Sequence, residues 1–138
     1  MREGGDVAII SWGTSVPVCL AAADSLAKLG ISASVLNLRW LSPLDRSAIR
    51  QVTETCGRVL IVHEANLTGG FGAEVMAGIT ERHSDHLKVP VKRLAAPDVP
   101  MPAAPMLQSS VVPSPSDVVK AASELVGRHL HRLATSSV

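Results

Sequence analysis

The sequence is poor in aromatic residues: its 138 residues include no tyrosine, one phenylalanine and two tryptophans. Proteins that bind single-stranded nucleic acids stack the bases on aromatic side chains, and this chain offers few of them. The charge is also balanced, since 13 basic and 12 acidic residues are scattered along the chain and give a formal net charge of +1. Without a basic patch or an aromatic platform, the sequence does not indicate nucleic acid as a partner.

Long apolar runs and sets of paired cysteines are missing as well. No apolar run approaches the ~20 residues that a membrane-spanning helix requires, and residues 1–6 are too polar for a signal peptide. The two cysteines, Cys19 and Cys56, do not make a disulfide framework and fit a reducing compartment. We therefore expect a cytoplasmic protein without a membrane partner.

The chain is rich in apolar residues, which make up 46% of it against 18% charged residues. This composition and length fit one domain with a substantial core. Short β-type runs alternate with helical patterns, which predicts an α/β fold with a largely parallel sheet. Strands are expected at 7–12, 32–38, 58–63 and 91–95, and helices at 15–29, 45–56, 71–82 and 116–129.

Proline punctuates the chain between the last predicted strand and the last predicted helix. Six prolines fall between Ala96 and Pro115. Proline has no backbone N–H and interrupts helices, so this stretch is expected to be an extended, non-helical loop packed over the surface. A loop of this length usually has a function.

A glycine-rich turn, HEANLTGGFGAE at 63–74, joins the third predicted strand to the third predicted helix. It follows the carboxyl end of a strand, the edge where ligands gather in open α/β sheets. The dinucleotide-binding fingerprint fails, because Val75 stands where that pattern needs glycine or alanine. A phosphate or carboxylate at the helix start stays open, and the favoured interpretation is that the glycines allow tight packing on another protein surface.

Histidines are the other candidates for chemistry. His63 beside Glu64 could act as a general base, but adjacent side chains of a strand point to opposite faces and no partnered nucleophile is evident. We therefore interpret His63 as a contact residue. The pairs His83-x-x-His86 and His129-x-His131 lack the further ligands that zinc sites supply, so no metal site is predicted.

Three motifs in order carry a family resemblance: NLRWLSPLD at 37–45, VHEANLTGGFGAE at 62–74 and APDVPMP at 96–102. Together they resemble the transketolase C-terminal domain family. Within it, the chain is most similar to the C-terminal domain of the β subunit of thiamine-diphosphate-dependent 2-oxo acid dehydrogenases, of the branched-chain or pyruvate type. The resemblance covers about residues 2 to 127.

The resemblance implies a fold and its boundaries. The expected fold is a three-layer α/β/α sandwich whose mostly parallel sheet has one antiparallel edge strand. The domain would span 7–131, after a linker remnant at 1–6 and before a disordered tail at 132–138.

The resemblance also implies a mainly architectural function. The domain would support subunit assembly and docking to the acyltransferase core, and would be inactive alone. Thiamine diphosphate and magnesium belong to the parent enzyme, and no cofactor is expected on this domain. The implied partners are the α subunit, a second β subunit and the subunit-binding domain of the acyltransferase, and the isolated chain is expected to form a homo-oligomer.

The residues expected at subunit contacts are His63, Glu64, Thr68, Gly69, Gly70, Phe71, Lys88 and Asp98. Lys88 departs from the family pattern, because members often place an acidic residue there that meets basic residues of the acyltransferase, and like charges repel. Two alternatives stay open. One is the corresponding domain of a transketolase or deoxyxylulose-phosphate synthase, with sugar-phosphate contacts near the turn. The other is a free-standing regulatory module that binds a nucleotide or other anion after Gly70.

Overall fold

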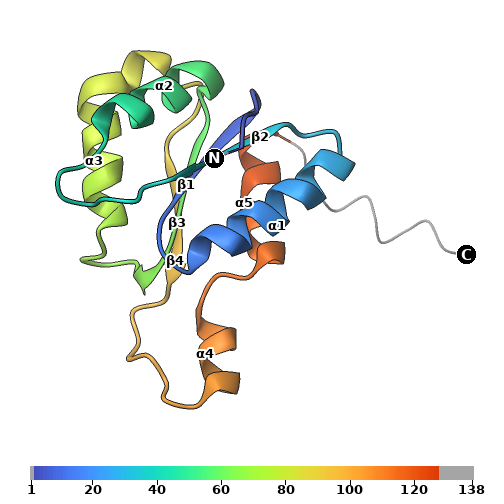
Figure 1. Ribbon diagram of the computed structural model, residues 1–138, viewed down its shortest axis with the longest axis vertical. Helices are drawn as coiled ribbons and strands as arrows, with labels where there is room; N and C mark the ends of the chain where they lie inside the picture. Colours follow the sequence, from blue (N-terminus) through green and yellow to red (C-terminus); the bar gives the residue numbers. More distant parts are fainter. Residues whose placement is uncertain (1, 128–138) are drawn as a thin grey trace, which may run out of the picture.

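A computed structural model describes residues 2–127 of the chain (Figure 1). One sheet holds four strands in the order β2-β1-β3-β4, and every pair of neighbours is parallel. The strands are β1 (Val7–Ser11), β2 (Ala33–Asn37), β3 (Val59–Asn66) and β4 (Lys92–Ala96). The helices are α1 (Ser15–Lys28), α2 (Arg46–Cys56), α3 (Gly72–His83), the 3-10 turn η1 (Ser84–His86), α4 (Pro105–Val111) and α5 (Pro115–Leu125).

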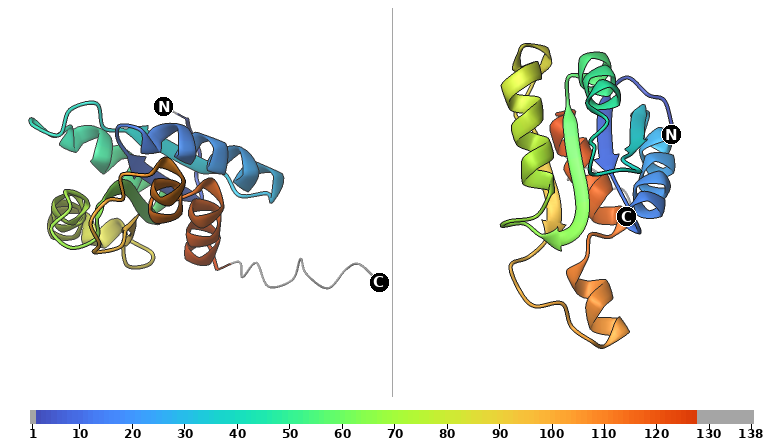
Figure 2. Two further views of the ribbon diagram at one scale, coloured as in Figure 1. Left: turned by 90° about the horizontal axis from the view of Figure 1, so that it is seen from below. Right: turned by 60° about the vertical axis from the view of Figure 1, so that its left-hand side comes forward.

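Two hydrophobic cores lie on opposite faces of the sheet. Successive residues of a strand face opposite sides, so Val7 and Ile9 of β1 belong to one core while Ala8 and Ile10 belong to the other. The first core is closed by α1 and α5 and the second by α2 and α3, and Figure 2 shows these helix layers on either side of the sheet. Burial on both faces explains the continuous apolar run of β1. The predicted three-layer α/β/α sandwich is confirmed.

The antiparallel part of the sheet is small among the described residues. It consists of one bridge between Arg2 and Val35 at the outer edge of β2. The same N-terminal segment is held by the Asp6 carboxylate, which accepts a hydrogen bond from the Ser32 N–H at 2.7 Å. The packed body of the protein therefore begins before Val7, and the segment expected to be a linker remnant covers the edge of β2.

Three helices are preceded by a residue type that commonly caps helices, and in two of them that residue forms the cap. The Asp45 side chain caps α2 by accepting from the Ala48 N–H at 3.0 Å, and Gly57 ends the same helix with a φ of +69°. Ser114 and Asp117 form a capping box at the start of α5. Thr14, in contrast, precedes α1 without capping it, because its hydroxyl instead donates to the Glu64 carboxylate.

The proline-rich stretch contains a helix that sequence reasoning missed. The expectation of an extended, non-helical loop is wrong for α4, where Pro105 occupies the first turn. Proline suits that position because the first N–H groups of a helix have no partner within the helix. Of the other five prolines, Pro115 is the first residue of α5, and the remaining four lie outside the helices.

Several predictions fall outside residues 2–127. These are the domain end at 131, the pair His129-x-His131 and the tail at 132–138. The last helix, expected to reach residue 129, instead ends at Leu125. Among the described helices, none combines the length and apolar character needed to cross a membrane.

Candidate assembly site at the carboxyl edge of the sheet

His63 lies inside the protein, beneath the glycine-rich turn. Its side chain is 1% exposed and stacks on Trp12, with ring centroids 5.3 Å apart and an interplanar angle of 11°. The Phe71 ring in turn packs edge-on against Trp12, with ring centroids 5.9 Å apart. The chain's single phenylalanine and one of its two tryptophans thus form one aromatic group with His63. Such burial does not fit the predicted role of His63 as a direct contact residue.

The glycines of the turn make room for the His63 ring. A Cβ atom on Gly72 would lie 2.3 Å from His63 Nε2, and one on Gly70 would lie 2.7 Å from His63 Cε1 and 2.3 Å from the Asn66 carbonyl oxygen. Gly69 has open space around it but a φ of +73°, which favours glycine. Packing and backbone geometry within the chain thus account for these three glycines.

The electrostatics of His63 favour a neutral imidazole. Burial lowers its pKa below the ordinary value, the positive charge of Arg93 lowers it further, and the backbone of Ala65 opposes this shift. Neither ring nitrogen has a hydrogen-bond partner of good geometry among the described residues. Glu64 does not orient the ring, because its carboxylate is bonded to the Thr14 hydroxyl. The His-Glu pair is therefore not arranged as a general base and its partner.

The glycine-rich turn and the proline-rich stretch are fastened to each other. The Asp98 carboxylate accepts two hydrogen bonds from Thr68, one from the backbone N–H at 2.9 Å and one from the hydroxyl at 2.6 Å. These bonds lower the pKa of the Asp98 carboxyl, the hydroxyl contributing most. Arg93 supports the turn by donating to the Leu67 carbonyl at 2.7 Å. We call the Thr68–Asp98 pair the clasp, and it makes one continuous surface of two segments far apart in sequence.

Lys88 lies at the opposite edge of the sheet from the clasp. It precedes β4, and its backbone N–H donates at 2.7 Å to the carbonyl of Gly57, which precedes β3. Its ammonium donates to the Cys56 carbonyl at 3.2 Å, at the C-terminus of α2. A cation there complements the negative end of the helix dipole. The predicted contact residues therefore divide into a group at the carboxyl edge and a single lysine at the amino edge.

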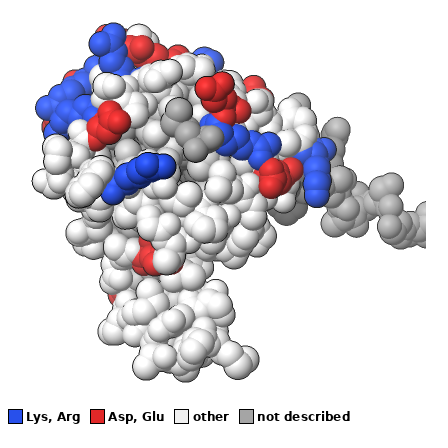
Figure 3. Space-filling model, in the orientation of Figure 1, with Lys and Arg blue, Asp and Glu red and all other residues white. Residues whose placement is uncertain are grey.

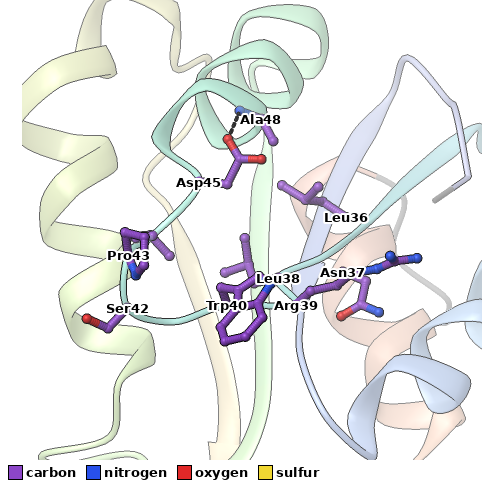
Figure 4. A pocket seen from close by; sticks show the side chains of 10 residues that line it. Leu36, Asn37, Leu38, Arg39, Trp40, Ser42, Pro43, Asp45 and Ala48 are labelled. Atoms are coloured by element: carbon purple, nitrogen blue, oxygen red, sulfur yellow. Dashed lines mark hydrogen bonds between the residues drawn. The ribbon is translucent and has the colours of Figure 1, made fainter.

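The loop after β2 forms a cavity of about 570 Å³ that sequence reasoning missed (Figure 4). Most of its lining side chains are apolar: Leu36, Leu38, Trp40, Pro43, Leu44 and Ala48. Trp40 is 72% exposed beside it. The Asp45 carboxylate on its border is already bonded to the Ala48 N–H, the dashed line in Figure 4. The motif at 37–45 marked this loop in the sequence without indicating a cavity.

A second feature that sequence reasoning missed is an exposed arm, residues 97–112, which we call the α4 arm. It carries α4 and leaves the carboxyl edge directly after β4. Its Met106 and Leu107 side chains are 87% and 56% exposed. The signal in the sequence is a gap in the charge pattern, because no charged residue occurs between Asp98 and Asp117.

Groups suited to covalent or metal chemistry are scarce in the described part of the chain. Both cysteines are free and buried, and burial raises the pKa of both thiols, that of Cys19 to about 11. Neither is a thiolate nucleophile near neutral pH. Residues 2–127 contain no cluster of three or more His, Cys, Asp or Glu side chains that could hold a metal ion. His86 instead lies 3.4 Å from the Glu54 carboxylate.

Comparison with known proteins shows which family has this fold and these motifs. A family model described as "Transketolase, C-terminal domain" matches residues 1–118. The chain belongs to this family. The chain also aligns with a solved structure described as "Split gene transketolase, inactive beta4 tetramer". The TM-score is 0.78 and the identity 28%, over 91% of this chain and 40% of that one.

Within the transketolase C-terminal domain family, the chain is similar to dehydrogenase β subunits. It is 40% identical to the pyruvate dehydrogenase E1 component subunit beta-2, mitochondrial, of Oryza sativa subsp. japonica, over 98% of this chain and 36% of the relative. It is 42% identical to the 2-oxoisovalerate dehydrogenase subunit beta of Bacillus subtilis (strain 168), over 90% of this chain and 38% of the relative.

The relatives bear on the choice between the predicted functions. The chain spans little more than a third of the length of these β subunits. They support the prediction that the chain is the C-terminal domain of a 2-oxo acid dehydrogenase β subunit, and they do not favour the transketolase alternative. These relatives are β subunits, which pair with α subunits.

Proposed function

We propose that this domain holds together a thiamine-diphosphate-dependent 2-oxo acid dehydrogenase through its carboxyl edge and is inactive alone. The observation that carries the proposal is the clasp, in which Thr68 and Asp98 fasten the glycine-rich turn to the α4 arm. A contact surface built from two loops needs such a fastening, because ordering mobile loops on binding costs affinity. His63, the strongest catalytic candidate, supports this surface from below, while Glu64, Thr68 and Asp98 lie on it.

Thiamine diphosphate and magnesium would be held by other parts of the enzyme. Magnesium is bound by oxygen ligands, chiefly carboxylates and substrate phosphates. The carboxyl edge offers Glu64 and Asp98, but each already accepts a hydrogen bond from a threonine hydroxyl. The described residues therefore do not fit the cofactor or its metal, and the proposal assigns them no step of the reaction.

The proposed partners are the α subunit and a second β subunit at the carboxyl edge. The amino edge, where the Lys88 ammonium lies at the C-terminus of α2, is the place for contact with the acyltransferase core. A lysine there requires an acidic surface on the acyltransferase, because opposite charges attract and like charges at an interface cost several kcal/mol. We also propose that the chain binds copies of itself, as the β4 tetramer formed by the split-gene transketolase makes plausible for a chain with this domain.

A chimera tests assembly. The part of the Bacillus subtilis 2-oxoisovalerate dehydrogenase β subunit that matches this chain, 38% of its length, would be replaced by this chain. The chimera would be produced together with the α subunit of the Bacillus enzyme. We expect co-purification of the two subunits, and weaker association when Thr68→Val and Asp98→Ala remove the clasp. A folded chimera that does not associate with the α subunit, under conditions in which the parent assembles, refutes the proposal.

Calorimetry on the isolated chain tests the absence of a cofactor site. We expect no heat of binding with thiamine diphosphate and magnesium. Sugar phosphates and nucleotides serve as the two further ligands, because binding of either would favour the transketolase or regulatory-module alternative. Binding of thiamine diphosphate by the isolated chain would overturn the assignment of the cofactor to other parts of the enzyme.

A further inference from the structure

The α4 arm, residues 97–112, extends away from the sheet and its covering helices in Figure 1 and in the right-hand view of Figure 2. After Asp98 at its base it bears no charge, since residues 99–116 include no Asp, Glu, Lys or Arg. Figure 3 shows the contrast: the lobe formed by the arm is white, while charged side chains gather over the upper body. Among the described residues, four of the seven large apolar side chains with high exposure belong to this arm: Val99, Met101, Met106 and Leu107.

Helix α4 lacks the packing that normally stabilises a helix of its length. It has seven residues, and none of them is buried. It makes no substantial contact with another helix or strand of the described chain. A helix this short is marginal in water, because nucleation is unfavourable and most helical stability in proteins comes from tertiary packing. The arm therefore has the properties of a segment that another surface covers.

The chemistry of the arm restricts what covers it. A charged partner surface would lose hydration against the arm without gaining an opposite charge. A second copy of the same arm presents an apolar, uncharged surface of the required kind. In a two-fold contact, residues at the symmetry axis lie near their own equivalents, so a charge at the centre of the contact would meet a like charge. The arm carries no charge after Asp98 at its base, so its centre avoids this repulsion.

We propose that the α4 arm is a self-association surface that packs against the α4 arm of a second copy of this chain. The clasp sets the direction of the arm, because Asp98 at its base is bonded to Thr68 of the glycine-rich turn. This inference rests on the proposed self-association of the chain and adds the surface through which it occurs. Met106 and Leu107 form the centre of the contact.

Sedimentation velocity over a range of concentrations tests the proposal. The variant Met106→Asp/Leu107→Asp places two carboxylates on each arm, and we expect its dissociation constant to rise by at least roughly 100-fold relative to the unchanged chain. The control is Leu20→Asp, which puts one carboxylate on an exposed apolar position of α1, outside the arm. The control should associate like the unchanged chain.

Folding of the variants is checked independently. No residue of α4 is buried, and Met106 and Leu107 are exposed, so far-UV circular dichroism and the urea midpoint should stay unchanged. A second variant, Met106→Ala/Leu107→Ala, keeps a good helix former at both positions and should also weaken association.

The outcomes separate this inference from the proposed function. If the unchanged chain associates and the arm variants associate equally well, the arm is the wrong surface and self-association stands. If the unchanged chain stays a monomer up to millimolar concentration, self-association and the arm contact are both refuted, while assembly of the chimera with its α subunit is judged separately.

Discussion

Two glycines of α3 should respond to the same substitution with opposite signs. Gly72→Ala places a methyl group 2.3 Å from His63 Nε2 and 2.5 Å from Cδ2. The ring cannot move aside freely, because it is buried and stacked on Trp12. Gly78→Ala places its methyl group 3.3 Å from the end of the Arg46 side chain, which is flexible. The first position is closed to a side chain and the second is open.

The magnitudes decide the two signs. Forcing an extra methyl group into a packed site costs about 1 to 3 kcal/mol, and displacing His63 would also weaken an aromatic stack worth about 0.5 to 1.5 kcal/mol. Alanine gains at most about 1 kcal/mol over glycine in a helix interior, and Gly72 is only the first residue of α3. We expect Gly72→Ala to lower the free energy of unfolding by about 1 to 3 kcal/mol. Gly78→Ala should raise it by up to about 1 kcal/mol.

Urea denaturation followed by circular dichroism measures both changes. The double variant His63→Ala/Gly72→Ala removes the ring that the new methyl group would strike, so its loss of stability should be smaller than the sum of the single losses. A coupling energy of about 0.5 to 3 kcal/mol is expected for residues in contact. If Gly72→Ala proves as stable as the unchanged chain, or if the two losses simply add, the account of why this turn needs glycine is wrong.

Two further predictions concern titration and the clasp. The pKa of His63 is lowered in the folded protein from its ordinary 6.5, so the unfolded chain takes up a proton more readily than the folded one. The contribution of His63 to the free energy of unfolding should therefore be complete above pH 6.5 and decline as the pH falls from there toward 5, a range in which most carboxyls do not titrate. The variant His63→Gln should lose this part of the pH dependence, measured as the urea midpoint at each pH. Asp98→Ala should speed hydrogen exchange of the Thr68 amide with little change in overall stability, since the pair is exposed; an unchanged exchange rate would show that the clasp does not order the turn.

The sequence was sufficient for the elements whose signals are local. β1 reads as a buried strand because both of its faces are covered, and α2 has its ends marked by Asp45 and Gly57. The missed helix α4 shows where local signals compete. Six prolines suggested a loop, while the one at Pro105 occupies the first helical turn, where proline is favoured.

The candidate site was less predictable, because its contacts join segments distant in sequence. The turn was recognised, but the reason for its glycines lies in the position of the His63 ring, which depends on Trp12 from another strand end. Thr14 directly precedes α1, a position where threonine commonly caps a helix, and instead bonds Glu64, 50 residues away. Lys88 was counted among the subunit contacts for its charge alone, and its position just before β4 puts it at the edge of the sheet opposite the turn.

The N-terminal segment has a consequence for where this domain can be cut. An uncovered strand at the side of a sheet recruits strands from other molecules. Here Arg2 exchanges two backbone hydrogen bonds with Val35, and Gly4 lies so close to Ala33 that a Cβ atom would be 2.4 Å from its carbonyl carbon. A fragment that starts at Val7 would keep every strand and helix and still lose the cover over β2. Such a fragment should precipitate or form sheet-to-sheet dimers, so residues 2–6 belong to the smallest unit that stays in solution.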